Sequence, residues 1–124
     1  MRNPLLTATV VMAVIVTTVA PARAADALVG EWALDAGQCA DTRIVYTADG
    51  RNEAWMMRDG GWSKLSSGSY THSGAELVVE ANGQRDQLHI VRLDAEVLEL
   101  RNADKERMAQ IGRDTVGFVR CPAR

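Results

Sequence analysis

The side chains that could do chemistry are few in this 124-residue chain, and they are widely spaced. His72 and His89 are too far apart in sequence to form a local metal motif. Neither Ser66 nor Ser73 lies in a nucleophile-elbow pattern, so nothing organises them into a triad with a histidine and an aspartate. The chain also has no glycine-rich phosphate-binding loop. We therefore predict no catalytic residue, no metal site and no cofactor.

The two cysteines, Cys39 and Cys121, are the other reactive pair. They lack the C-x-x-C spacing and the neighbouring histidines of a redox or metal-binding pair. In an exported protein an even number of cysteines indicates a structural disulfide. A bridge that closes a loop of about 80 residues removes unfolded-state entropy worth roughly 4–5 kcal/mol. That is a large share of the stability of a small domain.

The first 24 residues indicate export. Arg2 precedes an apolar stretch at 5–20, and Ala22-Arg23-Ala24 forms a small-x-small cleavage site. This pattern predicts a secretory signal peptide at 1–24 and a single mature domain at 25–124, in the periplasm or secreted. The alternative is a membrane anchor, but the apolar stretch is shorter than the roughly 20 residues of a spanning helix and ends at Pro21. We expect no membrane span in the mature chain.

The charge of the mature chain disfavours one class of partner. Removing the leader takes away two of the 14 basic residues and none of the 16 acids, so the formal net charge falls from −2 to −4. Nucleic-acid binding needs a basic surface that displaces counterions. We expect no nucleic-acid partner, and the sequence does not indicate an oligomeric state.

Short runs of alternating apolar and polar residues, separated by glycines, predict an all-β fold. Asp49-Gly50 and Asn82-Gly83 are hairpin-turn signals. The segments 62–65 and 68–72 form one interrupted strand or two short ones, and we favour an edge strand over a short helix at 102–110. Leu28, Trp32 and Leu34 share one phase of the first run. Seven to nine antiparallel strands must close into a small barrel or a sandwich to hide their edges.

A patch of aromatic and sulfur-containing side chains is the most distinctive local feature. Trp55 and Met57 share one face of a predicted strand, Met56 takes the other, and Trp62 follows a Gly-Gly turn. Methionines adapt to apolar ligands of imprecise shape. We predict ligand contacts from Trp55, Met57, Trp62 and Tyr70. The alternative is that these side chains fill the core and wrap one end of the barrel.

The two ends of the mature domain carry a family resemblance. A G-x-W motif, Gly30-Glu31-Trp32, lies on the first strand, and Arg120 lies on the last. In these features the chain resembles the lipocalin-like (calycin) β-barrels, which are up-and-down antiparallel barrels. The resemblance implies that Trp32 closes one end and that Arg120 packs across its ring, a contact worth about 0.5–2 kcal/mol. With about 100 residues, the barrel should be shallow, with a small or filled interior.

Three functions are compatible with this chain. We favour a non-catalytic, exported, lipocalin-like module that binds a small apolar ligand or a lipid. The alternative is a protein-interaction domain, such as a periplasmic protease inhibitor or an envelope accessory factor. A small hydrolase or isomerase would need clustered acid and base residues that the sequence does not indicate.

Overall fold

The computed structural model describes Ala13, residues 27–103, 106, 109–110, 112 and 114–124. The predicted signal peptide at 1–24 lies outside the described residues, apart from Ala13. No helix in the described part of the chain is long and apolar enough to cross a membrane.

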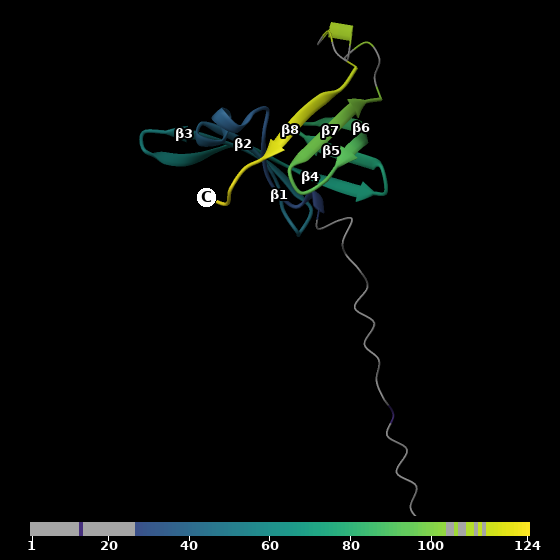
Figure 1. Ribbon diagram of the computed structural model, residues 1–124, viewed down its shortest axis with the longest axis horizontal. Coiled ribbons are helices and arrows are strands. Elements are labelled where there is room, and N and C mark those ends of the chain that lie inside the picture. Colours follow the sequence, from purple (N-terminus) through teal and green to yellow (C-terminus); the bar gives the residue numbers. More distant parts are fainter. Residues whose placement is uncertain (1–12, 14–26, 104–105, 107–108, 111, 113) are drawn as a thin grey trace, which may run out of the picture.

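Eight antiparallel strands form a closed barrel in sequence order, and the last strand pairs with the first. In Figure 1, β7 and β8 lie side by side, next to β5 and β6. The all-β fold predicted from the alternating pattern is therefore confirmed, and so is the small up-and-down barrel implied by the family resemblance. The elements are β1 (Gly30–Ala33), the 3-10 helix η1 (Ala36–Ala40), β2 (Thr42–Tyr46), β3 (Arg51–Arg58), β4 (Gly61–Ser73), β5 (Glu76–Ala81), β6 (Gln84–Leu93), β7 (Val97–Asn102) and β8 (Val116–Arg120).

Segments 62–65 and 68–72 belong to one strand, β4, which contains a bulge. Ala54 pairs with Ser66 and Trp55 pairs with Lys64, so Leu65 has no opposite residue in β3. A bulge of this kind bends and twists a strand locally, which helps a short sheet to close into a barrel. At the β4–β5 contact, a Cβ on Gly68 would lie 2.2 Å from the carbonyl oxygen of Glu80, so this close approach requires glycine.

The structure corrects two of the sequence-based predictions. The edge strand expected at 102–110 is wrong: β7 ends at Asn102, and the described residues Glu106, Ala109 and Gln110 are helical. These residue types favour helix, and β7 already pairs with β8, so the barrel has no open edge there. Leu34 does not continue the buried phase of the first strand. It is 56% exposed because β1 ends at Ala33 and the chain turns into η1.

The core lies inside the barrel and follows the predicted alternation. Its fully buried side chains are Trp32, Leu28, Leu77 and Leu98. The Asn82-Gly83 turn joins β5 to β6 with positive φ at both residues, 54° and 73°, as a type I′ hairpin requires.

The predicted disulfide is confirmed. Cys39 in η1 is bonded to Cys121, which directly follows β8. The side chain of Asp35 accepts a hydrogen bond from the backbone nitrogen of Gln38 at 2.9 Å, and this cap begins the short helix that presents Cys39. The bridge therefore fastens the C-terminal segment to the β1–β2 connection.

Candidate binding site

The first and last strands of the barrel meet at Trp32 and Arg120. Trp32 is completely buried, and its indole Nε1 donates a hydrogen bond to the carbonyl oxygen of Leu28 at 3.0 Å. The guanidinium of Arg120 lies 4.3 Å from the centroid of the Trp32 ring. It also donates to the carbonyl oxygens of Val29, at 2.9 Å, and Ala95, at 2.7 Å. These bonds join the segment before β1 and the β6–β7 turn to the last strand.

Gly30 makes room for this arrangement. A Cβ at this position would lie 2.3 Å from Nη1 of Arg120, and the φ of Gly30 is +148°. The glycine of the G-x-W motif is thus needed because it allows the guanidinium to reach the tryptophan ring.

A cavity of about 230 Å³ lies inside the barrel. Most of its lining is aliphatic or aromatic, and its polar lining residues are Asn52, Asp86 and Asn102. Asn102 is the last residue of β7 and Val116 the first residue of β8, so the cavity extends toward the end where these strands separate. The lining residues are Ile44, Tyr46, Asn52, Val79, Asp86, Leu88, Leu100, Asn102, Val116 and Phe118.

Two tyrosines form one side of this interior. The rings of Tyr46 and Tyr70 meet edge to face, with centroids 5.1 Å apart. Burial raises the pKa of Tyr46 to about 12, and the neighbouring Tyr70 adds to the shift. The hydroxyl of Tyr70 donates to the carbonyl oxygen of Thr47 at 2.6 Å, and burial, followed by the charge of Asp49, raises its pKa. Both phenols are therefore neutral at physiological pH.

The volume of the cavity sets the size of ligand that fits. An apolar cavity of about 150 Å³ is large enough for benzene, whereas drug-sized ligands occupy about 300–1,000 Å³. At about 230 Å³, this cavity, which is partly open to solvent, is somewhat larger than one that holds benzene. A few polar groups in an apolar lining fix the orientation of such a ligand.

The structure separates the four predicted ligand-contacting residues. Tyr70 points into the barrel, where it packs against the core. Asn52 and Ala54 pair with the inward-facing side of β2, so the alternating residues Trp55 and Met57 point outward. Trp62 pairs with Met57 and shares that outer face. The predicted patch thus consists of an outer group, Trp55, Met57 and Trp62, and the inner Tyr70. Trp55 also lines a hollow of about 220 Å³ together with Trp32 and Phe118.

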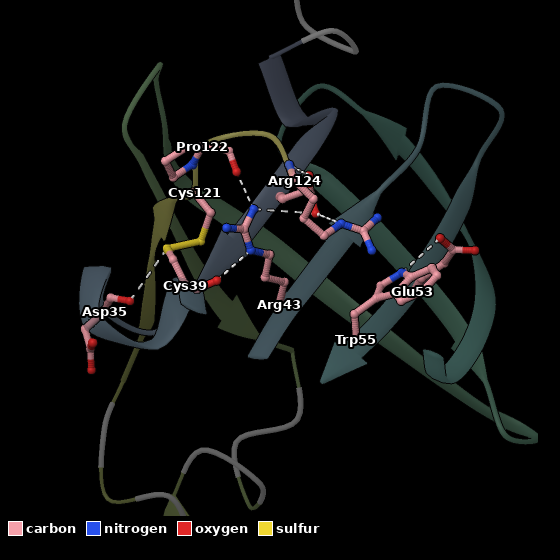
Figure 2. A network of polar contacts seen from close by, with 9 residues as sticks. Asp35, Cys39, Arg43, Glu53, Trp55, Cys121, Pro122 and Arg124 are labelled. Carbon is pink, nitrogen blue, oxygen red and sulfur yellow. Dashed lines mark hydrogen bonds and ion pairs between the residues drawn. A yellow bond between two sulfur atoms is a disulfide. The ribbon is translucent and has the colours of Figure 1, made fainter. Parts of the chain in front are cut away.

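Cationic side chains cover the two outer tryptophans. The guanidinium carbon of Arg124, the last residue, lies 4.2 Å from the Trp55 ring centroid and 5.8 Å from that of Trp62. Arg43 lies 5.2 Å from the Trp62 ring and Lys64 lies 5.3 Å from the Trp55 ring. Figure 2 shows the Arg124 side chain extending from the C-terminal segment toward Trp55. We call Trp55, Trp62 and the adjoining Glu31 the outer tryptophan site.

Two acids balance these cations. Glu31 is paired with Arg124 at 2.5 Å and with Arg43 at 3.7 Å. Glu53 is paired with Lys64 at 2.9 Å and accepts a hydrogen bond from the Trp55 indole at 3.3 Å. The pKa of Glu53 is lowered, mainly by the hydrogen bond from Lys64. The site therefore combines aromatic faces with carboxylate groups.

Arg43 connects the outer tryptophan site to the disulfide. Its buried guanidinium donates to the carbonyl oxygen of Cys39 at 2.7 Å and to that of Pro122 (Figure 2). The backbone nitrogen of Cys121 donates to the carbonyl oxygen of Glu31 at 2.8 Å. The C-terminal segment is thus held firmly as far as Pro122.

The two histidines lie apart on the barrel. His72 Nε2 is 2.8 Å from the carbonyl oxygen of Gly74, and His89 Nδ1 is 3.8 Å from Glu76. Within the described residues, no three histidine, cysteine, aspartate or glutamate side chains gather in a way that could hold a metal ion.

A wider hollow of about 510 Å³ lies over the β5–β6 turn. Its lining is largely polar, and its charged members are paired: Arg51 with Glu53 at 3.5 Å, and Arg85 with Glu80 at 3.8 Å. This open, polar hollow is a poorer place for an apolar ligand than the smaller interior cavity.

Three residues of these sites were not identified from the sequence: Asp86, Asn102 and Arg124. Asp86 shares the phase of Leu88, and Asn102 shares the phase of Leu98 and Leu100, so strand alternation could have placed both in the interior. Arg124 follows the last strand, where no periodic pattern applies.

Comparisons with known proteins support the fold. No family model matches the chain, and no curated protein matches it. Among solved structures, a lipocalin-like protein from Bacteroides uniformis ATCC 8492 is similar, with a TM-score of 0.53 and 16% sequence identity over 77% of this chain and 99% of that one. Together with the closed eight-stranded barrel, this similarity confirms the lipocalin-like fold expected from the G-x-W motif and Arg120.

Proposed function

We propose that this lipocalin-like barrel is a non-catalytic, exported module that binds a small apolar ligand in its interior. The observation that carries the proposal is the cavity of about 230 Å³ lined by inward-facing residues of the barrel. A second hollow of about 220 Å³ lies beside the buried Trp32 and is lined in part by Trp55 and Phe118. Moving apolar surface from water into such a space is favourable by about 25 cal/mol per Å². The ligand has a mainly apolar body, because seven of the ten lining residues are apolar or aromatic.

The polar lining residues narrow the ligand class. Asn52, Asp86 and Asn102 line the same cavity as Phe118 and Leu100. A few polar side chains in an otherwise apolar pocket favour a ligand with one polar group that they can orient. We therefore propose a small amphiphilic molecule, such as a short-chain or single-ring compound.

The proposed location is the periplasm or the extracellular space. The leader at 1–24 has the pattern of a secretory signal peptide. A disulfide such as Cys39–Cys121 persists in oxidising compartments and is rare in the cytosol of mesophiles. Both observations support export.

A titration with single-ring compounds such as indole tests the binding proposal. We expect methyl NMR signals of Leu88, Leu100 and Val116 to shift and saturate. Val116→Phe fills the cavity and should abolish the shifts. Val91→Phe is the matched control, because Val91 is 44% exposed outside the core. Shifts that survive in Val116→Phe, or no shift with any small apolar compound, would overturn the proposal.

The alternative function is a protein-interaction domain acting through the outer face. The observation that favours it is Met57, which is 37% exposed beside the outer tryptophans. Capture of a defined partner that is lost in Met57→Glu, with the interior cavity empty, would support this alternative.

A further inference from the structure

We infer that the outer tryptophan site is a guanidinium-binding site, and that the chain's own Arg124 is its displaceable occupant. The external ligand is an arginine side chain or a smaller guanidinium compound. This site lies outside the barrel and is independent of the interior cavity.

The geometry around Arg124 is that of a cation held against aromatic faces. Its guanidinium lies 4.2 Å from the Trp55 ring and 5.8 Å from the Trp62 ring, both within the roughly 6 Å range of cation–π attraction. A planar, weakly hydrated guanidinium stacks on tryptophan better than an ammonium does. The structure therefore contains an example of the chemistry that the site accepts.

The carboxylate of Glu31 provides the second recognition element. It is 14% exposed, so its attraction for a cation is screened less than that of a surface pair. Arg124 Nε lies 2.5 Å from Glu31 Oε1, and the backbone nitrogen of Arg124 donates to Oε2 at 3.3 Å. Yet among the described residues no donor makes a hydrogen bond of normal geometry to the buried Oε1. A guanidinium that replaces Arg124 can place two of its own N–H groups on the two carboxylate oxygens, where Arg124 uses its Nε and its backbone nitrogen.

The position of Arg124 makes it displaceable. The C-terminal segment is fixed through Cys121 by the disulfide and through Pro122 by Arg43, which leaves Ala123 and Arg124 beyond the last anchor. Moving Arg124 out of the site therefore breaks neither the disulfide nor the Arg43–Pro122 hydrogen bond. The aromatic rings, Glu31 and Glu53 remain in place because they belong to β1, β3 and β4.

The tail competes with any external ligand. A tethered group acts at an effective concentration of the order of millimolar for a short flexible link. Removing the Arg124 side chain should therefore strengthen the binding of an external guanidinium. The same removal should leave the barrel folded, because the last described contact of the ladder is at Arg120.

The test compares Arg124→Ala with the wild-type protein by NMR of the tryptophan indole groups. The probe is N-acetylarginine amide, and its neutral isostere N-acetylcitrulline amide is the chemical control. We expect the variant to bind the arginine probe at least fivefold more tightly than the wild type. The indole signals of Trp55 and Trp62 should shift and that of Trp32 should not, and the citrulline probe should give no shift.

A second variant and a second probe complete the design. Arg101→Ala removes the same charge from an exposed position on β7 and should bind like the wild type. Acetyl-Pro-Ala-Arg, which repeats the tail, distinguishes the two sources of the guanidinium. Tighter binding than the single amino acid indicates a protein C-terminus, and equal binding indicates that the guanidinium alone suffices. No indole shift in Arg124→Ala, an equal response to citrulline, or an equal gain in Arg101→Ala would overturn the inference.

Discussion

Arg120 and Trp32 lie directly opposite each other where the last strand pairs with the first, with the guanidinium 4.3 Å from the centroid of the indole ring. The pair belongs to the β8–β1 ladder, and the guanidinium packs on a completely buried indole. Arg120 also donates hydrogen bonds to the carbonyl oxygen of Val29, in the segment before β1, and to that of Ala95, in the β6–β7 turn.

Trp32→Ala should destabilise the fold by about 3–5 kcal/mol, because it deletes a completely buried indole and leaves a void under Arg120. Urea unfolding of the purified protein measures the change in the free energy of unfolding. Leu34→Ala is a control, because Leu34 is exposed. Wild-type stability in Trp32→Ala would show that the tryptophan does not close the barrel.

Gly30→Ala should cost about 1–3 kcal/mol, because the new methyl group would overlap Nη1 of Arg120 and the backbone at this residue has positive φ. Gly117→Ala, in β8, is the matched control: its Cβ would meet no atom within 4 Å. Thermal unfolding of both variants measures the melting temperatures to be compared. Equal melting temperatures for the two would contradict the steric role of Gly30.

Cys39→Ser should lower the melting temperature by roughly 15 °C or more, since the bridge spans 82 positions and its entropic contribution is about 4–5 kcal/mol. Calorimetry under non-reducing conditions tests this expectation. The double variant Cys39→Ser/Cys121→Ser controls for the free thiol and should melt at a similar temperature. Wild-type melting in both would mean that the bridge contributes nothing to stability.

The two tyrosines should titrate above their ordinary pKa of about 10. Burial keeps Tyr46 neutral in the folded state up to a pKa of about 12, whereas it ionises near 10 in the unfolded chain. Its contribution to stability is therefore fully present below pH 10 and is lost as the pH rises toward 12. Phenolate absorbance measured against pH checks the raised pKa values. Unfolding of Tyr46→Phe checks the effect on stability, because this variant should lose less stability at alkaline pH than the wild type. Phenolate formation near pH 10 in the folded protein would contradict the burial of Tyr46.

Strand alternation predicted much of the fold, because most strands bury one face only. Ile44 and Tyr46 point inward as their phase indicates, and the Asp49-Gly50 and Asn82-Gly83 turns lie between strands. The edge strand predicted at 102–110 was wrong. That segment has too few apolar residues for their spacing to distinguish a strand from a helix. The need to hide edges predicted closure into a barrel or a sandwich, and the resemblance to lipocalin-like barrels implied the up-and-down barrel that the structure has.

The sites were less predictable for a physical reason. The strand with Trp55, Met56 and Met57 has apolar side chains on both faces, so alternation groups Trp55 with Met57 but does not say which face is inside. The outer tryptophans are covered by cations from β2, β4 and the last residue, contacts that depend on the tertiary fold. No periodic pattern in the sequence predicts these contacts.

Native mass spectrometry of the protein purified from its own envelope fraction tests the central claim most directly. We predict one small non-covalent mass per chain in the wild-type protein, and its loss in Val116→Phe, in which the new ring fills the interior cavity. A wild-type protein that carries no small mass, or the same small mass retained in Val116→Phe, would contradict the account.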